Sequence, residues 1–330
     1  MATFVARRLA NHAVLVVLAA SLGYLLAAAA LDPRTGLEDR APRPPEAVID
    51  ARLGALNLDD RTPLARRYLT WAGGVVHGDF GRTWAGEPVG GELRRRLGVS
   101  LRLSAPGAVL GSAMGVALGA YAAVRRGRAA DRLISGGTCL LLAAPVFVLA
   151  VLLQIAAGEV NDALGMRVFV WVGETAPGAS RGALWDLADR ARRLALPTAT
   201  IALCQLALCA RYQRGLMLDV LHADHVRAAR ARGLRRRGAL LRHGLRIAIV
   251  PMTTYAAYTS GLVLLGGVFT ETAFGRHGLG EWLVGSISRG DANAVAAVEC
   301  LAACAVVLAA LASDVLAGVL DPRVRRGSTP

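Results

Sequence analysis

Long apolar runs alternate along the chain with short segments rich in Arg or in Pro and Gly. A helix needs about 20 consecutive apolar residues to cross the hydrocarbon core of a bilayer. Six runs are long enough, with approximate bounds 12–31, 101–123, 133–157, 194–217, 248–270 and 293–319. The pattern therefore predicts an all-α integral membrane protein with six transmembrane helices.

The first apolar run is interpreted as an uncleaved membrane anchor. Arg7 and Arg8 precede it, and Ala27–Ala30 resemble a processing site, so a cleaved signal peptide is the alternative. The apolar core of a signal peptide has about 7–15 residues, and this run is longer. The anchor is therefore the favoured interpretation.

Arginine placement predicts which segments face the cytoplasm. The N-terminal segment, the loops after the second and fourth runs, and the tail carry many Arg and few acids. Residues 32–99 hold 11 Arg against 10 Asp and Glu, and residues 158–193 hold five of each. Short Arg-rich loops stay cytoplasmic, whereas a long segment can be translocated despite its charges. Both termini are therefore predicted to be cytoplasmic.

Composition excludes several functions. The chain is 54% hydrophobic with a net charge of +14, and all 38 basic residues are Arg. Without Lys it can form neither a Walker A phosphate loop nor a Schiff base, so any ATP hydrolysis must take place in another subunit. Nucleic-acid binding is not expected, because the Arg residues flank membrane runs and aromatic residues make up only 5% of the chain.

Metal and thiol chemistry are not predicted. The five Cys all lie in apolar runs and form no C-x-x-C pair, which favours a packing role. His222 and His225 share one helix face, but no third ligand lies near them in the sequence. No metal site is therefore expected.

Two patterns within the apolar runs are candidates for packing or transport. The first is a glycine every four residues in the second run, at Gly107, Gly111, Gly115 and Gly119. This stripe predicts close packing with another helix, either of the same subunit or of a neighbouring one. The second is the set of acids at membrane depth, Glu271, Glu299 and Asp314, which are functional candidates by default. Glu299 could face a water-filled path, although a lone acid is poor evidence for proton coupling.

These features predict the organisation of the chain. Residues 1–31 form the N-terminal segment and first transmembrane helix, and residues 32–99 an extracytoplasmic subdomain with helices at about 46–55 and 64–75. Residues 100–320 form the transmembrane core, with a cytoplasmic loop at 218–247, and residues 321–330 a cytoplasmic tail.

The loop between the fourth and fifth runs is the most specific segment. Asp224 is suited to N-cap a short helix, Val226 to Arg232 favour helix, and Gly233 favours its end. A rigid, Ala-rich helix held between two membrane helices would fit a groove in another protein. The alternative is a basic loop whose arginines only reflect its position on the cytoplasmic side of the membrane.

At these residues the chain resembles the B-type permease subunits of oligopeptide, dipeptide and nickel ABC importers. The stretch Ala228-Ala229 to Gly233 is similar to the EAA motif of that family, and Leu245-Arg246 with Pro251 continues it. Further similar stretches lie at 56–59, 67–71, 78–81, 274–280 and 320–323. Arg227 stands where the EAA motif has its acid, which this subfamily often lacks, and His277 stands where a Pro is common. Leu31-Asp32-Pro33-Arg34 replaces the usual Pro-Gly-Asp-Pro. The second outer loop, 171–178, is most similar to actinobacterial oligopeptide permeases.

The resemblance implies the fold of a type I ABC importer permease in the inner membrane, in contact with lipid. Its implied partners are a second homologous permease, two ATPase subunits that use ATP and Mg²⁺, and an extracytoplasmic protein that delivers peptides, in particular oligopeptides. The chain itself would bind no cofactor and catalyse no reaction.

The resemblance also implies roles for individual residues. The residues expected to couple transport to the ATPase are Asp224, Val226, Arg227, Ala228, Ala229, Arg230, Arg232, Gly233 and Leu234. Candidates for the translocation path or its gate are Glu271, Phe274, Gly278, Gly280 and Glu299. A bulky or charged residue at Ala229 or Gly233 is expected to leave the protein inserted but to uncouple transport.

Three alternatives differ in cargo or class. The same type of permease could carry nickel chelates or another small solute. An ion-coupled secondary transporter would be expected to show internal repeats, and none is evident. An intramembrane enzyme would need paired Asp, His-rich spans or a Ser/Lys dyad, but the chain has no Lys and its His lie mostly in loops.

Overall fold

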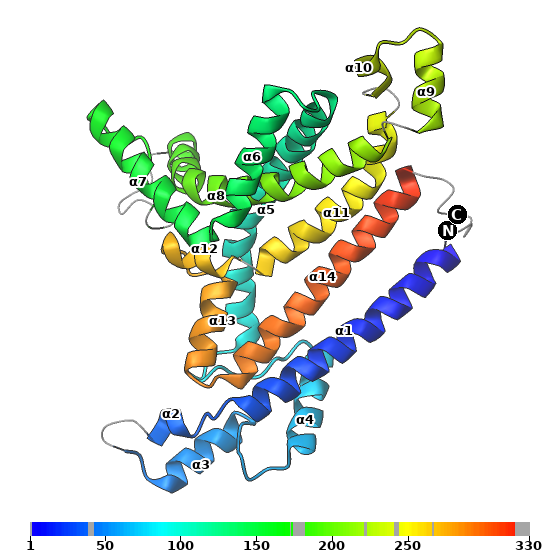
Figure 1. Cartoon of the computed structure of the whole chain (residues 1–330). Helices are drawn as coiled ribbons and strands as arrows, with labels where there is room; N and C mark the ends of the chain where they lie inside the picture. Colours follow the sequence, from blue (N-terminus) through cyan, green and yellow to red (C-terminus); the bar gives the residue numbers. More distant parts are fainter. Residues whose placement is uncertain are drawn as a thin grey trace. The chain divides into compact units, whose positions relative to one another are not determined.

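The structure, a computed structural model, describes residues 2–38, 43–171, 173, 182–220, 223–240, 244–265 and 267–320. It divides into two compact units, one of residues 1–100 and 277–308 and the other of residues 101–276 and 309–330. Regular structure in the described residues is helical (Figure 1), apart from an isolated bridge between Arg82 and Pro88. The predicted all-α class is confirmed.

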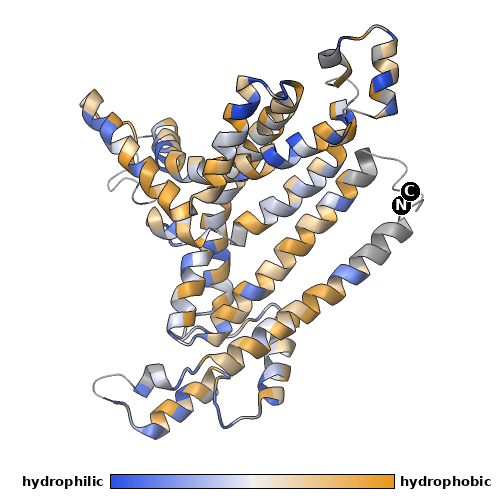
Figure 2. Cartoon of the chain, viewed as in Figure 1, coloured by the Kyte–Doolittle hydropathy of each residue, from blue (hydrophilic) through white to orange (hydrophobic). Residues whose placement is uncertain are grey.

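Five helices in the described part of the chain are long and apolar enough to cross a membrane. They are α1 (Ala2–Ala30), α5 (Val89–Val124), α7 (Val146–Leu164), α8 (Ala183–Val220) and α14 (Ala292–Leu320), and Figure 2 shows their apolar residues. The predicted span 248–270 largely coincides with α11 (Leu245–Leu265), which is not among the five. The structure thus supports a membrane protein, and the count of six spans stays a prediction.

The predicted span 133–157 is wrong, because two helices occupy it. These are α6 (Ala129–Ala143) and α7, and Ala144 between them has an extended backbone with φ −79° and ψ 130°. A residue before proline avoids helical angles, so Pro145 ends α6 at this point. The helix long and apolar enough to span begins after Pro145 and runs to Leu164.

In the first unit, the segment after α1 folds against α1 and the start of α14. Three helices lie in it: α2 (Thr35–Glu38), α3 (Glu46–Ala55) and α4 (Leu64–Val76). The two predicted helices are thereby confirmed as α3 and α4. Tyr24 of α1 stacks on Trp71 of α4 with ring centroids 4.5 Å apart. Ile49 of α3 is fully buried in a cluster with residues of α1 and α14.

In the second unit, α8 is the central helix and packs against α6, α7 and α11. The glycine stripe of α5 faces α8. A Cβ built at Gly111 would lie 2.5 Å from the carbonyl oxygen of Ala202, and one at Gly115 would lie 2.6 Å from the Cβ of Cys209. The two backbones therefore approach so closely that only glycine fits, and the partner of the stripe is a helix of the same chain.

Candidate functional site

Helix α9 (Asp224–Ala231) lies between α8 and α11 and carries most of the predicted coupling residues. The carbonyl oxygen of Ala223 accepts hydrogen bonds from the N–H groups of Val226 (3.0 Å) and Arg227 (3.1 Å). Ala223 therefore caps α9, and the prediction that Asp224 is the N-cap is wrong. Asp224 is the first helical residue, where its negative charge favours the helix dipole and forms an ion pair with Arg227.

One face of α9 anchors the helix to its own chain. Val226 and Ala229 are buried, one turn apart, and Leu234 packs against them. The cluster around them draws on α5, α8, the segment after α9 and α11, through Ala120, Ala123, Met217, Ala239, Leu240 and Ala248. The buried face of α9 is therefore part of a hydrophobic cluster shared with these other segments.

The opposite face of α9 is exposed. Asp224, Arg227, Ala228 and Ala231 lie on it, at the spacing i, i+3, i+4 and i+7 that defines one helix face. Arg232 is exposed just beyond the helix, while the side chain of Arg230 lies outside the described residues. Ala228 and Ala231 have short side chains, so the backbone of α9 is accessible on this face.

The structure changes the expected effect of two substitutions. Ala229 is buried against its own chain, so a bulky or charged residue there would also disturb the packing of α9, and a loss of transport by such a variant would not report on coupling alone. Gly233 has φ +92°, a conformation that other residues adopt only with strain. Ala228, the neighbour of Ala229 on the exposed face, is the position at which docking alone can be tested.

An ion pair joins α6 to the C-terminal part of α8, the part that precedes α9 in the sequence. The carboxylate of Asp131 accepts from Arg214 Nε (2.7 Å) and from its second guanidinium nitrogen (3.0 Å). It also accepts from the backbone N–H of Gly127 at 2.9 Å. Asp131 is buried. The pair is bidentate and joins the start of α6 to α8.

This ion pair predicts a pH dependence. The Arg214 guanidinium beside Asp131 lowers the pKa of that carboxyl from 3.8 to about 2. A lowered pKa in the folded state stabilises the fold above the unfolded pKa, and this contribution is lost as the pH falls from about 4 to about 2. Asp131→Asn should therefore lower the free energy of unfolding by about 2 kcal/mol at pH 7. In thermal unfolding of the purified chain, the difference from wild type should shrink at pH 3, and an unchanged difference would contradict this account.

The predicted path residues divide between the two units. Glu271 and Phe274 belong to the second unit and are fully buried, in and just after α12 (Val268–Ala273). Gly278 and Gly280 belong to the first unit, at the start of α13 (Leu279–Ser288), where both are buried.

Glu299 of α14, also in the first unit, is exposed. A Cβ built at Gly23 of α1 would lie 3.1 Å from the Cβ of Glu299. The position of Glu299 therefore marks a close approach of α1 and α14. The role of all five path residues stays a prediction.

Sequence reasoning missed two polar contacts in the second unit. One is the pair of Asp131 and Arg214. The other is Gln205 of α8, which donates hydrogen bonds to Thr259 of α11 (2.8 Å) and Ser112 of α5 (3.1 Å). The signal for the second contact was a Gln within an apolar run, because a buried amide in such a run needs partners from neighbouring helices.

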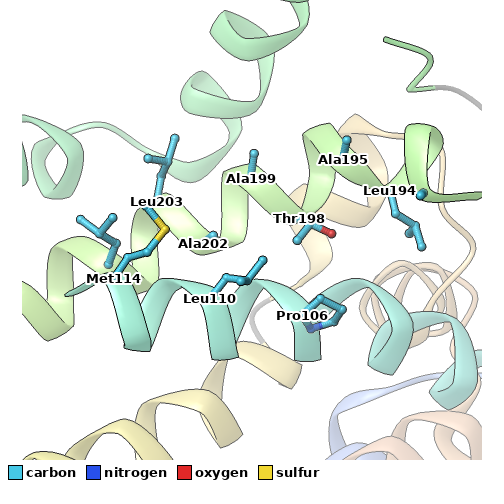
Figure 3. Close-up of a pocket in the computed structure, with 11 residues that line it drawn as sticks. Pro106, Leu110, Met114, Leu194, Ala195, Thr198, Ala199, Ala202 and Leu203 are labelled. Atoms are coloured by element: carbon cyan, nitrogen blue, oxygen red, sulfur yellow. The ribbon is translucent and has the colours of Figure 1, made fainter. Parts of the chain in front are cut away.

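An apolar hollow between α5 and α8 is the other candidate feature of the second unit. Its volume is about 560 Å³, and Figure 3 shows Pro106, Leu110 and Met114 on one side and Thr198 and Leu203 on the other. Among the described residues of its lining, Thr198 supplies the only side-chain hydroxyl. Such a surface suits hydrocarbon and offers no charged group to bind the ends of a peptide.

Known proteins similar to this chain have transport functions. Residues 115–326 match the family described as "Binding-protein-dependent transport system inner membrane component". The oligopeptide transport system permease protein OppB of Mycobacterium tuberculosis is 49% identical over 326 residues, 98% of this chain and 99% of that protein. The dipeptide transport system permease protein DppB of Escherichia coli K12 is 31% identical over 292 residues, 83% of this chain and 84% of that protein.

Proposed function

The chain belongs to the family of binding-protein-dependent transport system inner membrane components, and on this basis we propose that α9 is the helix through which an ATPase subunit moves it. The chain is a permease subunit of a peptide ABC importer, without enzymatic activity of its own, and a component of the inner membrane. It works with ATPase and substrate-binding partners. The alternative of a nickel or other small-solute carrier is not favoured, because the relatives of this chain given above are named as peptide permeases.

We further propose the assembly and cargo. The chain pairs with a second, homologous permease above two ATPase subunits, which bind ATP and Mg²⁺, while this chain binds no cofactor. Oligopeptides are the proposed cargo, supported by the 49% identity to an oligopeptide permease. The distribution of Arg supports six spans with both termini cytoplasmic and residues 32–99 outside.

The main support for the coupling role is that α9 has one buried and one exposed face. Its buried face, Val226 and Ala229, packs with α5, α8 and α11, and its opposite face is exposed. When ATP closes the ATPase dimer, a partner seated on the exposed face would pull α9 and the helices under it as one body. The membrane helices would then alternate between two states that ATP binding favours unequally.

Recovery of the assembly from membranes tests this function. Tagged chain is purified in mild detergent, and the proteins recovered with it are identified and assayed for ATP hydrolysis. We expect a second permease and an ATPase, with hydrolysis stimulated by the peptide-loaded binding protein. A chain recovered alone that takes up peptide under an ion gradient would contradict the proposal.

A further inference from the structure

The exposed face of α9 and its flank are positively charged. Arg227 lies on this face, Arg232 directly follows the helix, and Arg235 is exposed three residues further on. Among residues 223–235, Asp224 is the one acid. We propose that this surface docks into an acidic groove of the ATPase subunit, so that Asp and Glu of the partner face Arg227 and Arg232. The inference rests on the proposed function, because it names the chemistry of the same docking contact.

The ion pair of Asp224 with Arg227 does not satisfy this charge. The two residues are one turn apart, and their side chains are 93% and 68% exposed. Exposed pairs of this kind contribute less than about 1 kcal/mol. Arg227 can therefore exchange Asp224 for a carboxylate of a partner at little cost, and Asp224 keeps its favourable place at the helix N-terminus.

Docking removes water from the exposed face, and this step determines what the partner must offer. Removing water from a guanidinium without supplying an anion in its place costs several kcal/mol of free energy. Ala228 and Ala231 bring the partner close to the helix backbone, so the neighbouring Arg227 would lose water with them. A groove with carboxylates at its rim meets this requirement, whereas a neutral or basic groove does not.

The surface beside α9 carries the same charge. Ala123, near the end of α5, lies in the cluster that anchors Val226 and Ala229. The chain continues from there to Arg126 and Arg128, which are both exposed. Two acids lie nearby. Asp131 is buried and bonded to Arg214, so it does not offset this charge, and Asp219 near the end of α8 is exposed but is outnumbered by the exposed arginines. An acidic partner would thus be attracted over more than α9 itself.

Anionic lipid headgroups could also bind arginines near a membrane, but the geometry favours a protein. Lipid binding requires positive charge alone. Here the arginines flank a helix that exposes Ala228 and Ala231 on one face and buries Val226 and Ala229 in a hydrophobic cluster on the other. A fixed shape of this kind is needed for a protein groove and not for mobile headgroups.

Charge reversal on the assembled importer tests the inference. Arg227→Glu, Arg227→Lys and the double variant Arg227→Glu/Arg232→Glu are purified with their ATPase in nanodiscs of phosphatidylcholine, with or without phosphatidylglycerol. Arg66→Glu, an equal charge change on an exposed residue of α4, is the matched control. We expect Arg227→Glu to reduce ATPase recovery at least about tenfold in both lipids, since close charge pairs at interfaces couple by more than about 1.4 kcal/mol. Arg227→Lys and Arg66→Glu should recover as much ATPase as the wild-type chain does.

The other outcomes separate the inference from the proposed function. Normal recovery with Arg227→Glu, together with loss of recovery by the bulky Ala228→Trp, would overturn the acidic groove and leave α9 as the docking helix. Normal recovery with both variants would overturn the proposed function as well. A loss confined to discs with phosphatidylglycerol would assign the arginines to lipid and overturn the inference.

Discussion

Replacing Gly111 with Leu is expected to prevent the chain from folding in the membrane. A Cβ at this position would lie 2.5 Å from the carbonyl oxygen of Ala202 and 2.7 Å from the Cβ of Gln205. The first of these atoms belongs to the backbone of α8, so no side-chain rotation relieves the overlap. Overpacking of this kind costs about 1–3 kcal/mol or more, and close backbone contact is what holds membrane helices together. The yield of folded chain should fall at least about tenfold.

The measurement is size-exclusion chromatography of the tagged chain in mild detergent, followed by thermal unfolding of the main peak. Gly136→Leu is the matched control, because Gly136 lies in α6 and a Cβ there would meet no atom within 4 Å. The control should elute and unfold as wild type does. Equal yields of Gly111→Leu and Gly136→Leu would show that the stripe does not hold α5 to α8.

Tryptophan at Ala228 is expected to abolish transport without unfolding the protein. Ala228 is exposed on α9, so the indole would stand on the face that we propose as the docking surface for the ATPase and would hold the two proteins apart. ATP-driven peptide uptake into proteoliposomes, measured per folded permease, should fall at least about tenfold. Ala229→Trp is the matched variant, because the same residue type lies on the buried face.

The two variants should fail in different ways. Ala229→Trp overpacks the anchoring cluster and should cost about 1–3 kcal/mol of stability, so less folded protein is recovered. Ala228→Trp should unfold at the wild-type temperature and recover little ATPase. Full uptake by Ala228→Trp, or a loss of stability equal to that of Ala229→Trp, would contradict the division of α9 into an anchoring and a docking face.

The membrane class could be predicted from sequence because hydropathy is a sum over a local window. The helix bounds could not. α5 begins at Val89 and α8 at Ala183, each about ten residues before its predicted span, because a helix continues beyond its apolar part. A proline in the sequence does not by itself predict whether a helix ends there. Pro106 and Pro197 lie inside helices, whereas Pro145 lies between α6 and α7.

The site could be predicted as a segment but not as a surface. Gly233 and the Ala-rich stretch before it indicate a short helix wherever they occur. Ala228 and Ala229, however, are identical residues, and only the packing of α5, α8 and α11 makes one exposed and the other buried. The pair of Asp131 with Arg214 likewise joins residues 83 positions apart, which no local pattern connects.

The same limit applies to the glycine stripe. The four-residue spacing fixes the helix face that the glycines share, as the sequence predicts. It does not identify the helix that covers this face. The structure assigns that place to α8 of the same chain, through its close contacts at Ala202 and Cys209.

Cross-linking from α9 tests most directly whether this helix seats in the ATPase. The chain contains no Lys, so a thiol-to-amine cross-linker attached to α9 can reach only the lysines of partners, apart from the amine of the N-terminus. The variants Ala228→Cys and Ala229→Cys are compared in a background in which the exposed Cys139 is replaced by Ser. We expect a covalent product of this chain with the ATPase from Ala228→Cys, its yield changed by ATP, and none from Ala229→Cys. No product from Ala228→Cys in an assembly that still hydrolyses ATP would show that the exposed face of α9 does not contact the ATPase.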